Sequence, residues 1–342
     1  MPHRVRLISL AIASILPLAA CSNDQGDPAQ EPTSEPDAAT TISLAHPFPA
    51  DSIPGRAAET FADLVEESGG ELAVEVSAEA EAWVGDELTS QLADGDVDAI
   101  LVTTAGTGLD PRLQLQSLPF LATSPQEAHE LFYGTGLVAA YEADVFHEHG
   151  VQPVYQFEAG FRGLSASGKA VRLPEDLDGL SVRVFPAPWM IEAFESWGAT
   201  PEDVPADKLK KALEKGDVDA QESGVRSFIS SGLAEVQDTF TDLRHSYATY
   251  TLVMGDAAWK QLSGEEREIL EQAAREASEA SQEEVQAADD QAHESLGDEV
   301  ELVVPTKEEY AAWRASVRDI YVRYQRAFGK KIIRSLSKRP GS

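Results

Sequence analysis

The chain of 342 residues is poor in cysteine and in basic side chains. Its one cysteine excludes an internal disulfide. Only 27 Lys and Arg stand against 59 Asp and Glu, which gives a formal net charge of −32. Such a surface repels the phosphates of nucleic acid, so we expect no nucleic-acid partner. With 42% hydrophobic residues, the chain can still form an ordinary globular core.

Motifs of the common catalytic and nucleotide-binding sites are also missing. The sequence has no Gly-x-Ser-x-Gly elbow and no phosphate-binding loop that ends in Gly-Lys-Ser/Thr. His147 and His149 have the spacing of a metal pair, but a solvated helix end is the better explanation because no third ligand is near. We therefore expect no catalytic residue, no metal site and no cofactor.

The N-terminus carries the pattern of an export signal. Arg4 and Arg6 precede an apolar run over residues 7–18, which is too short for a permanent membrane-spanning helix. The sequence Leu18-Ala-Ala-Cys21 resembles a bacterial lipobox, although an ordinary signal with a coincidental cysteine is the alternative. We predict a lipoprotein signal peptide over 1–20 and a lipid anchor at Cys21 with a flexible tether over 21–40. The protein is then periplasmic or extracytoplasmic and meets the membrane through this lipid only.

Strand and helix patterns alternate along the rest of the chain, which indicates an α/β fold. Capping boxes at Ser263 with Glu266 and at Thr306 with Glu309 mark two late helices, the first reaching about residue 296. Strands are predicted near residues 41–45, 72–76, 98–102, 151–157, 180–184 and 218–221. Helices are predicted near residues 53–67, 85–93, 124–150, 188–197 and 206–215.

A five-residue word occurs twice, as Gly95-Asp-Val-Asp-Ala99 and Gly216-Asp-Val-Asp-Ala220. Each copy follows a predicted helix and precedes a predicted strand, so glycine would end the helix before the chain enters a sheet. Chance is one explanation, and two related α/β lobes are the other. Ligands bind outside the carboxyl ends of such strands, which here are residues 103–105 and 221–223.

Two arginines stand out in an otherwise acidic region. Arg162 lies in Gly160-Phe-Arg162, and Arg183 ends a strand with apolar neighbours. A buried guanidinium needs a partner, so Arg183 should contact either a structural acid or a ligand anion. A ligand carboxylate would suit its planar fork of donors.

Several motifs in a fixed order resemble the DctP-type solute-binding proteins of tripartite ATP-independent periplasmic (TRAP) transporters. They include Leu118-Pro-Phe-Leu121, Gly160-Phe-Arg162, Asp176-Leu-x-Gly-Leu-x-Val-Arg183, Gly216-x-Val-Asp-x-Gln-Glu222 and His245-Ser-Tyr247. The resemblance runs from about residue 42 to 277. It implies a two-lobed flytrap fold in which each lobe is a sheet flanked by helices, with a long connecting helix. Lobe I would contain residues 41–160 and about 249–288, and lobe II residues 161–248 and about 289–335.

The resemblance also implies a function and a site. The protein would bind a small organic acid or a zwitterionic carboxylate and deliver it to TRAP permease subunits in the membrane, without enzymatic activity. Arg183 would clamp the carboxylate with support from Arg162, while Ser223 replaces the family's frequent asparagine and Trp83 replaces a polar residue. The predicted binding residues are Arg183, Arg162, Ser223, Thr103, Thr104, Phe185, Glu222, Tyr247, Trp83 and His46. For the aromatic side chains, core packing is the alternative.

Two other functions fit the same residues. An extracytoplasmic enzyme could anchor an acidic substrate on Arg183, but no histidine is obviously placed as a general base. A sensing lipoprotein could present its closed form to a receptor. The basic segment 314–342, with nine Lys and Arg against one acid, could face anionic lipid or pair with the acidic helix after Ser263.

Overall fold

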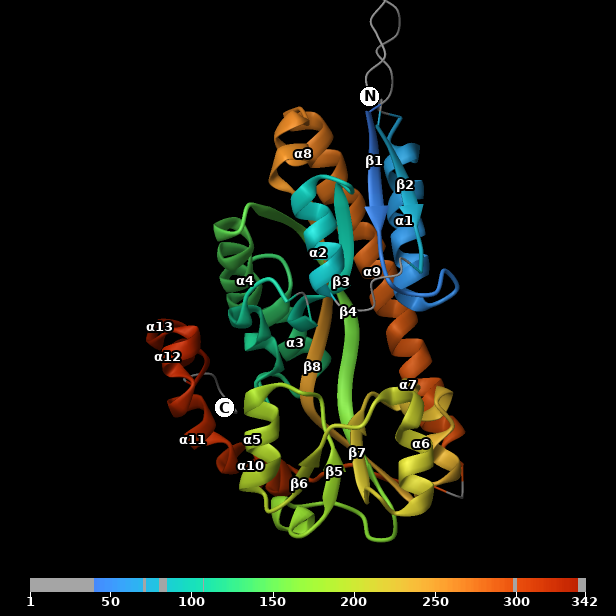
Figure 1. The fold of residues 1–342 in the computed structure, drawn as a ribbon, viewed down its shortest axis with the longest axis vertical. Helices are drawn as coiled ribbons and strands as arrows, with labels where there is room; N and C mark the ends of the chain where they lie inside the picture. Colours follow the sequence, from blue (N-terminus) through green and yellow to red (C-terminus); the bar gives the residue numbers. More distant parts are fainter. Residues whose placement is uncertain (1–39, 70–71, 80–84, 107, 298–299, 338–342) are drawn as a thin grey trace, which may run out of the picture. The chain divides into compact units, whose positions relative to one another are not determined.

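A computed structural model describes residues 40–69, 72–79, 85–106, 108–297 and 300–337 (Figure 1). Residues 39–342 form one compact unit. The predicted lipidation site Cys21 and the predicted binding residue Trp83 lie outside the described residues. In the part of the chain that is described, no helix has the length and apolar character needed to cross a membrane.

The first part of the unit alternates strands and helices as predicted, and it confirms the α/β class. Ser52 caps the first helix through a hydrogen bond from the Gly55 amide, and a proline follows in the first turn. The elements are β1 (Thr40–Ala45), α1 (Ile53–Glu67), β2 (Leu72–Ser77), α2 (Gly85–Asp94), β3 (Ala99–Thr103), α3 (Pro125–Phe132) and α4 (Leu137–Glu148), with short 3₁₀ turns at Thr104–Gly106 and Pro111–Ser117.

The single helix predicted over residues 124–150 is wrong, because α3 and α4 are separate helices. Gly134 adopts a left-handed φ of 55° between them. At Gly136, a Cβ would lie 2.4 Å from the carbonyl oxygen of Leu131. These two glycines interrupt a hydrophobic pattern that otherwise continues through the break.

The second part continues the alternation and ends in helices. Its first elements are β4 (Val151–Ala166), β5 (Ser181–Arg183), α5 (Pro188–Ser196), β6 (Thr200–Glu202), α6 (Ala206–Lys215), β7 (Ala220–Ser223), α7 (Val225–Ser230) and β8 (Thr239–Gly255), with 3₁₀ turns at Pro174–Leu177 and Leu233–Glu235. Then follow α8 (Asp256–Gln261), α9 (Gly264–Ser295), β9 (Glu301–Val303), α10 (Lys307–Ser316), α11 (Arg318–Arg323), α12 (Gln325–Phe328) and α13 (Lys330–Leu336). Both predicted capping boxes are confirmed, at Ser263 and Thr306.

One sheet path of order β2-β1-β3-β8-β4-β7-β5-β6 joins the strands, and β9 pairs with β8. The two longest strands, β4 and β8, run antiparallel in its middle and so connect the two halves (Figure 1). Their register shifts near Pro153, near Glu158 and near Arg162. Such bulges bend and twist a strand locally. Helix α9 contacts α1 in one half and α7 in the other, as expected for a long connecting helix.

The repeated five-residue word makes the same contacts in both halves. Gly95 and Gly216 are left-handed, with φ of 78° and 71°, directly after α2 and α6. Asp98 Oδ2 accepts hydrogen bonds from the amide and hydroxyl of Ser43 in β1, at 2.9 and 2.8 Å. Asp219 Oδ2 accepts the same two bonds from Ser181 in β5, at 2.8 and 2.7 Å. The repeat therefore marks two related β-α-β arrangements.

The C-terminal helices pack on one half of the molecule. Trp313 and Ile333 are fully buried in a core that also contains Trp189 and Trp197. Within the described residues, Arg314 pairs with Glu127 and Arg323 with Glu192. The predicted alternative, in which this basic segment pairs with the acidic helix α9, is therefore wrong for these two arginines.

Candidate functional site

Sheet order brings the two predicted arginines together. Strand β7 lies between β4, which carries Arg162, and β5, which ends at Arg183. In the ladder, Leu164 of β4 is opposite Glu222, and Arg183 is opposite Gln221. Both arginines therefore lie beside the carboxyl end of β7, a strand of the second repeat.

Arg162 is engaged by a protein carboxylate. Its Nε lies 2.6 Å from Glu222 Oε2, and its Nη2 lies 3.0 Å from Glu222 Oε1. Glu222 is fully buried, and its Oε1 also accepts the Phe185 amide at 2.6 Å. The His245 Nε2 lies 3.4 Å from its other oxygen. Glu222 therefore fixes both the Arg162 guanidinium and the backbone that follows β5.

The pKa values of this pair agree with a stable ion pair. Burial acts to raise the pKa of Glu222, but Arg162 and His245 outweigh it and hold the pKa at about 2. Burial likewise acts to lower the pKa of Arg162, but the charge and hydrogen bonds of Glu222 raise it above the ordinary value. Both groups are charged at neutral pH.

Arg183 differs because it has no counter-ion among the described residues. It is half-buried, and its Nε donates to the Val204 carbonyl oxygen at 3.3 Å. No carboxylate oxygen of the described chain lies within 4.0 Å of its guanidinium. Burial and the neighbouring charge of Arg162 lower its pKa, and Glu222 and Asp203 offset this only in part. A guanidinium stays protonated nonetheless, so Arg183 carries a positive charge that an anionic ligand could neutralise.

The predicted hydroxyl donors have different surroundings. Thr103 is half-buried and lies opposite Tyr250 in the sheet. Thr104 is fully buried, and its hydroxyl bonds to the Thr249 hydroxyl at 2.9 Å. The Ser223 hydroxyl makes only a long bond of 3.3 Å to the carbonyl oxygen of Gly224. Of the three, Thr103 and Ser223 keep donors that a ligand could use.

The predicted aromatic side chains separate in the same way. Phe185 is half-buried, and its backbone amide donates to Glu222 of the Arg162–Glu222 pair. Tyr247 is buried, with its hydroxyl 2.8 Å from that of Tyr133 and its ring 4.8 Å from that of Phe161. Tyr247 lines a hollow together with Glu158 and residues of α9, and Arg183 does not line that hollow.

His46 carries a donor without a partner. Its ring is fully buried, and Nδ1 accepts the Phe48 amide at 3.2 Å. Burial lowers its pKa, so the ring is neutral and the proton lies on Nε2. No partner for Nε2 exists among the described residues. This N–H can serve a ligand acceptor.

Tyr250 was not predicted, although it belongs with this group. Its ring packs edge-on against Phe48 at 4.8 Å. Burial raises its pKa, while the positive charges of Arg226 and Arg162 act in the opposite direction. Recognition of β8 as a strand would have drawn attention to Tyr250. Tyr247 and Tyr250 are three residues apart, so in a strand their side chains point to opposite faces of the sheet.

A third arginine of this region, Arg226, is already bound to protein acceptors. Its Nε lies 2.6 Å from Asp289 of α9, and its Nη2 donates to the Ala159 carbonyl oxygen at 2.6 Å. Arg226 is therefore half of an ion pair and not a free positive group.

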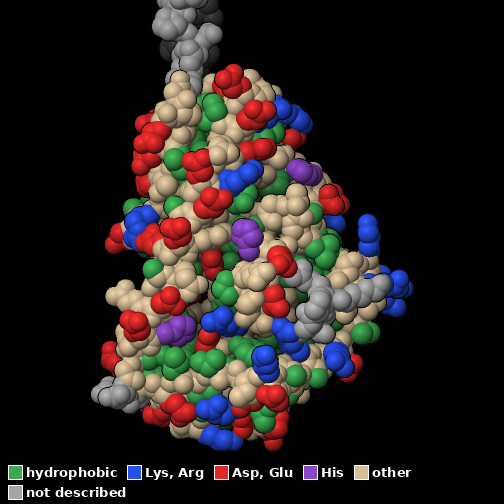
Figure 2. Space-filling view, turned by 180° about the vertical axis from the view of Figure 1, so that it is seen from behind, with side chains coloured by type: hydrophobic (Ala, Val, Ile, Leu, Met, Phe, Trp, Pro, Cys, Tyr) green, Lys and Arg blue, Asp and Glu red, His purple; other side chains and the backbone are tan. Residues whose placement is uncertain are grey.

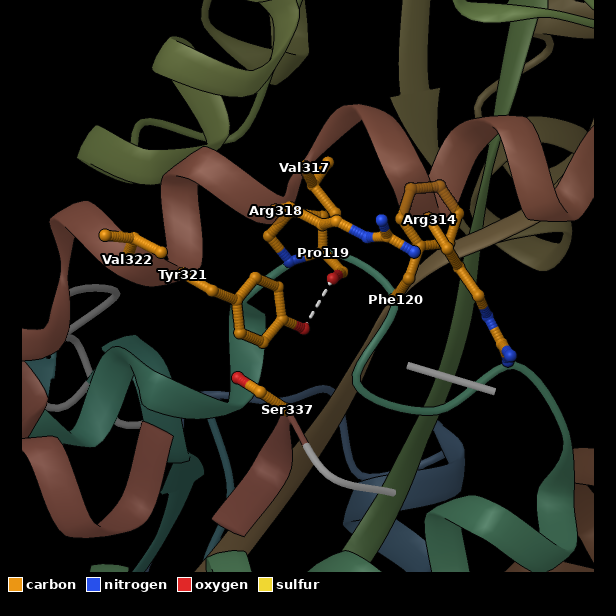
Figure 3. A pocket seen from close by; sticks show the side chains of 8 residues that line it. All are labelled: Pro119, Phe120, Arg314, Val317, Arg318, Tyr321, Val322 and Ser337. Carbon is orange, nitrogen blue, oxygen red and sulfur yellow. Dashed lines mark hydrogen bonds between the residues drawn. The ribbon is translucent and has the colours of Figure 1, made fainter. Parts of the chain in front are cut away.

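Metal ligands are not clustered in the described chain. No group of three or more His, Cys, Asp or Glu with metal-binding geometry occurs there. His147 bonds to Gln152, and His149 bonds to Asp110. An apolar hollow is lined by Pro119, Phe120 and residues of the C-terminal helices (Figure 3), and Arg183 is not among its lining residues. Unpaired charge therefore locates the candidate site better than cavity shape.

Glu158, at a bulge of β4, gives a pH prediction. Burial and the nearby Asp289 raise its pKa to about 7, against the influence of Tyr247 and Arg226. The folded state binds this proton more tightly than the unfolded state does. The contribution of the proton to the stability of the fold is therefore complete at low pH and is lost as the pH rises through 7. We expect Glu158→Gln to match the wild type near pH 4 and to exceed its unfolding free energy by up to about 3 kcal/mol above pH 8.

Denaturant unfolding at several pH values measures this difference. The control is Glu271→Gln, which removes an exposed carboxylate from α9. A constant difference between Glu158→Gln and the wild type at all pH values would contradict the assignment.

Comparisons with known proteins place the chain in a family. The family model of the bacterial extracellular solute-binding proteins, family 7 (DctP), matches residues 44–327. The C4-dicarboxylate-binding protein DctB of Bacillus subtilis is 26% identical over 286 residues, which cover 82% of this chain and 81% of that protein.

Solved structures agree in fold. A TRAP periplasmic solute-binding protein from Ochrobactrum anthropi, whose C-terminus is bound in its ligand-binding pocket, is 26% identical with a TM-score of 0.82, covering 87% of this chain and 93% of that one. A second, from Sulfurospirillum deleyianum with bound succinate, is 25% identical with a TM-score of 0.72, covering 88% and 99%. The predicted two-lobed flytrap fold is thereby confirmed. The chain belongs to the DctP family, the solute-binding proteins of TRAP transporters.

Proposed function

We propose that this protein captures a small carboxylate-containing solute outside the cytoplasmic membrane and delivers it to TRAP permease subunits, without changing it chemically. The observation that carries the proposal is the half-buried guanidinium of Arg183, which lacks a counter-ion in the described chain. A buried unpaired cation costs stability, and a ligand carboxylate would remove that cost. The relative named for C4-dicarboxylates and the structure with bound succinate support this ligand class.

In this proposal the ligand lies between two lobes. Lobe I comprises residues 41–160 and about 249–288, and lobe II comprises residues 161–248 and about 289–335. Arg183 binds the carboxylate, with Arg162 and Ser223 beside it and the apolar Phe185 near it. From lobe I, Thr103 and the Nε2 proton of His46 would reach other acceptors of the solute.

Three predicted residues act indirectly in this proposal. Glu222 orients Arg162, because both of its oxygens are already occupied. The hydroxyls of Thr104 and Tyr247 bond to protein partners and so support neighbouring residues. Trp83 remains a predicted contact. We further propose that residues 1–20 are a signal peptide, that Cys21 is lipidated and that residues 21–40 are a tether, which together hold the protein at the outer face of the membrane.

A panel of small acids tests the ligand class. A ligand at about 100 times its Kd stabilises the folded state by about 2.7 kcal/mol, which corresponds to roughly 4 °C for a unit of this size. We expect one or a few carboxylic acids to give this shift, while their uncharged amides give none. Mass spectrometry should then recover the bound acid unchanged. Equal shifts by acid and amide would contradict carboxylate recognition, and a chemically altered ligand would indicate an enzyme.

A further inference from the structure

The C-terminal segment has a charge that the proposed function does not use. Residues 314–342 hold nine Lys and Arg against one acid, in a chain of net charge −32. Five of these side chains are exposed and have no ion pair in the described part of the chain: Arg318, Arg326, Lys330, Lys331 and Arg334. We call these five residues the basic surface. Figure 2 shows Lys and Arg side chains gathered on the side where α11, α12 and α13 lie.

Helix α13 shows why these charges face outward. Ile332, Ile333 and Leu336 are buried in the core, while Lys330, Lys331 and Arg334 are exposed on the other face. Folding therefore fixes one face of the helix and leaves a row of cations in solvent. None of these three cations forms an ion pair in the described chain, so their charges are available to an external partner.

An apolar hollow adjoins the basic surface. Its volume is about 250 Å³, and Arg318 lies on its wall (Figure 3). Next to it, Val322 is 63% exposed, which is the highest exposure of any large hydrophobic side chain described. The other apolar lining comes from Pro119, Phe120 and Val317, and the Tyr321 hydroxyl donates to the Pro119 carbonyl oxygen at 2.7 Å.

We propose that this face docks on an anionic phospholipid bilayer. The phosphates of an anionic bilayer match the charge of the basic surface, and its apolar chains can contact Val322 and the hollow. The remaining acidic surface does not prevent contact, because salt screens charges beyond about 10 Å at 0.1 M. The contact goes beyond solute binding and does not depend on lipidation of Cys21. It would orient the folded unit against the membrane.

Vesicle sedimentation tests the proposal with residues 39–342, which form a compact unit. We expect co-sedimentation with vesicles of phosphatidylglycerol and phosphatidylcholine and none with phosphatidylcholine alone. Binding should disappear when salt rises from about 0.1 to 1 M, because the screening length falls to about 3 Å. Equal binding to both vesicles, or no binding to the anionic ones, would overturn the proposal.

Matched charge variants locate the contact. The combined change Lys330→Gln, Lys331→Gln and Arg334→Gln should weaken binding to anionic vesicles about 100-fold. The control changes three exposed cations of α6, Lys208→Gln, Lys211→Gln and Lys215→Gln, with the same loss of charge. It should bind like the wild type. A second variant, Arg318→Gln with Arg326→Gln, repeats the test on other helices, and equal weakening by the α6 control would refute the assigned face.

Discussion

Arg183→Ala is expected to weaken binding of the carboxylate solute by about 30-fold to more than 1,000-fold. Truncating one partner of a buried, hydrogen-bonded charge pair costs about 2–5 kcal/mol of binding free energy. The unliganded variant should be at least as stable as the wild type, because the change removes a half-buried cation that has no counter-ion in the described chain. Calorimetric titration and thermal unfolding measure the two effects separately.

Two further variants test the origin of this loss. Arg183→Lys keeps the charge but not the planar fork, so it should bind more weakly than the wild type and more tightly than Arg183→Ala. Arg275→Ala removes an exposed arginine of α9 and should leave affinity unchanged. The same affinity for Arg183→Ala and the wild type would refute the clamp.

Glu222→Ala is expected to destabilise the folded protein by about 3 kcal/mol even without a ligand. Loss of one partner from a buried ion pair leaves the other charge uncompensated. Here the Arg162 guanidinium and the Phe185 amide would both lose their acceptor. The double change Arg162→Met with Glu222→Leu should recover much of the stability, because a buried pair replaced by apolar side chains is often neutral.

The pH dependence of Glu222→Gln has a definite sign. The pKa of Glu222 lies at about 2 in the folded protein, below its usual value of 4.5. Its ion pair therefore stabilises fully above about pH 4.5 and fades as the pH falls toward 2. The difference from the wild type should be large at pH 7 and shrink in acid. As a control, Glu301→Gln removes an exposed ion pair with Arg172 and should cost under about 1 kcal/mol.

Local patterns predicted most of the elements and singled out one arginine of the candidate site. The left-handed glycines and the Ser–Asp contacts of the two repeats follow from a five-residue word, because that word both ends a helix and enters a strand. Arg183 could be recognised from a cation among apolar strand residues. These features depend on neighbours in the sequence.

The features that sequence could not give depend on distant neighbours. Strand β8 was missed because its Thr, Tyr and Val residues are buried on both faces and do not alternate clearly. Without β8, the position of Tyr250 opposite Thr103 could not be inferred. The engagement of Arg162 by Glu222, 60 residues away, likewise required the order of β4, β7 and β5.

A crystal structure with the most stabilising acid of the panel tests the central claim most directly. We expect the carboxylate oxygens of that acid about 2.7–3.2 Å from the Arg183 guanidinium, with Arg162 still bonded to Glu222. A carboxylate bound away from Arg183, with Arg183 paired to a protein acid instead, would contradict the account.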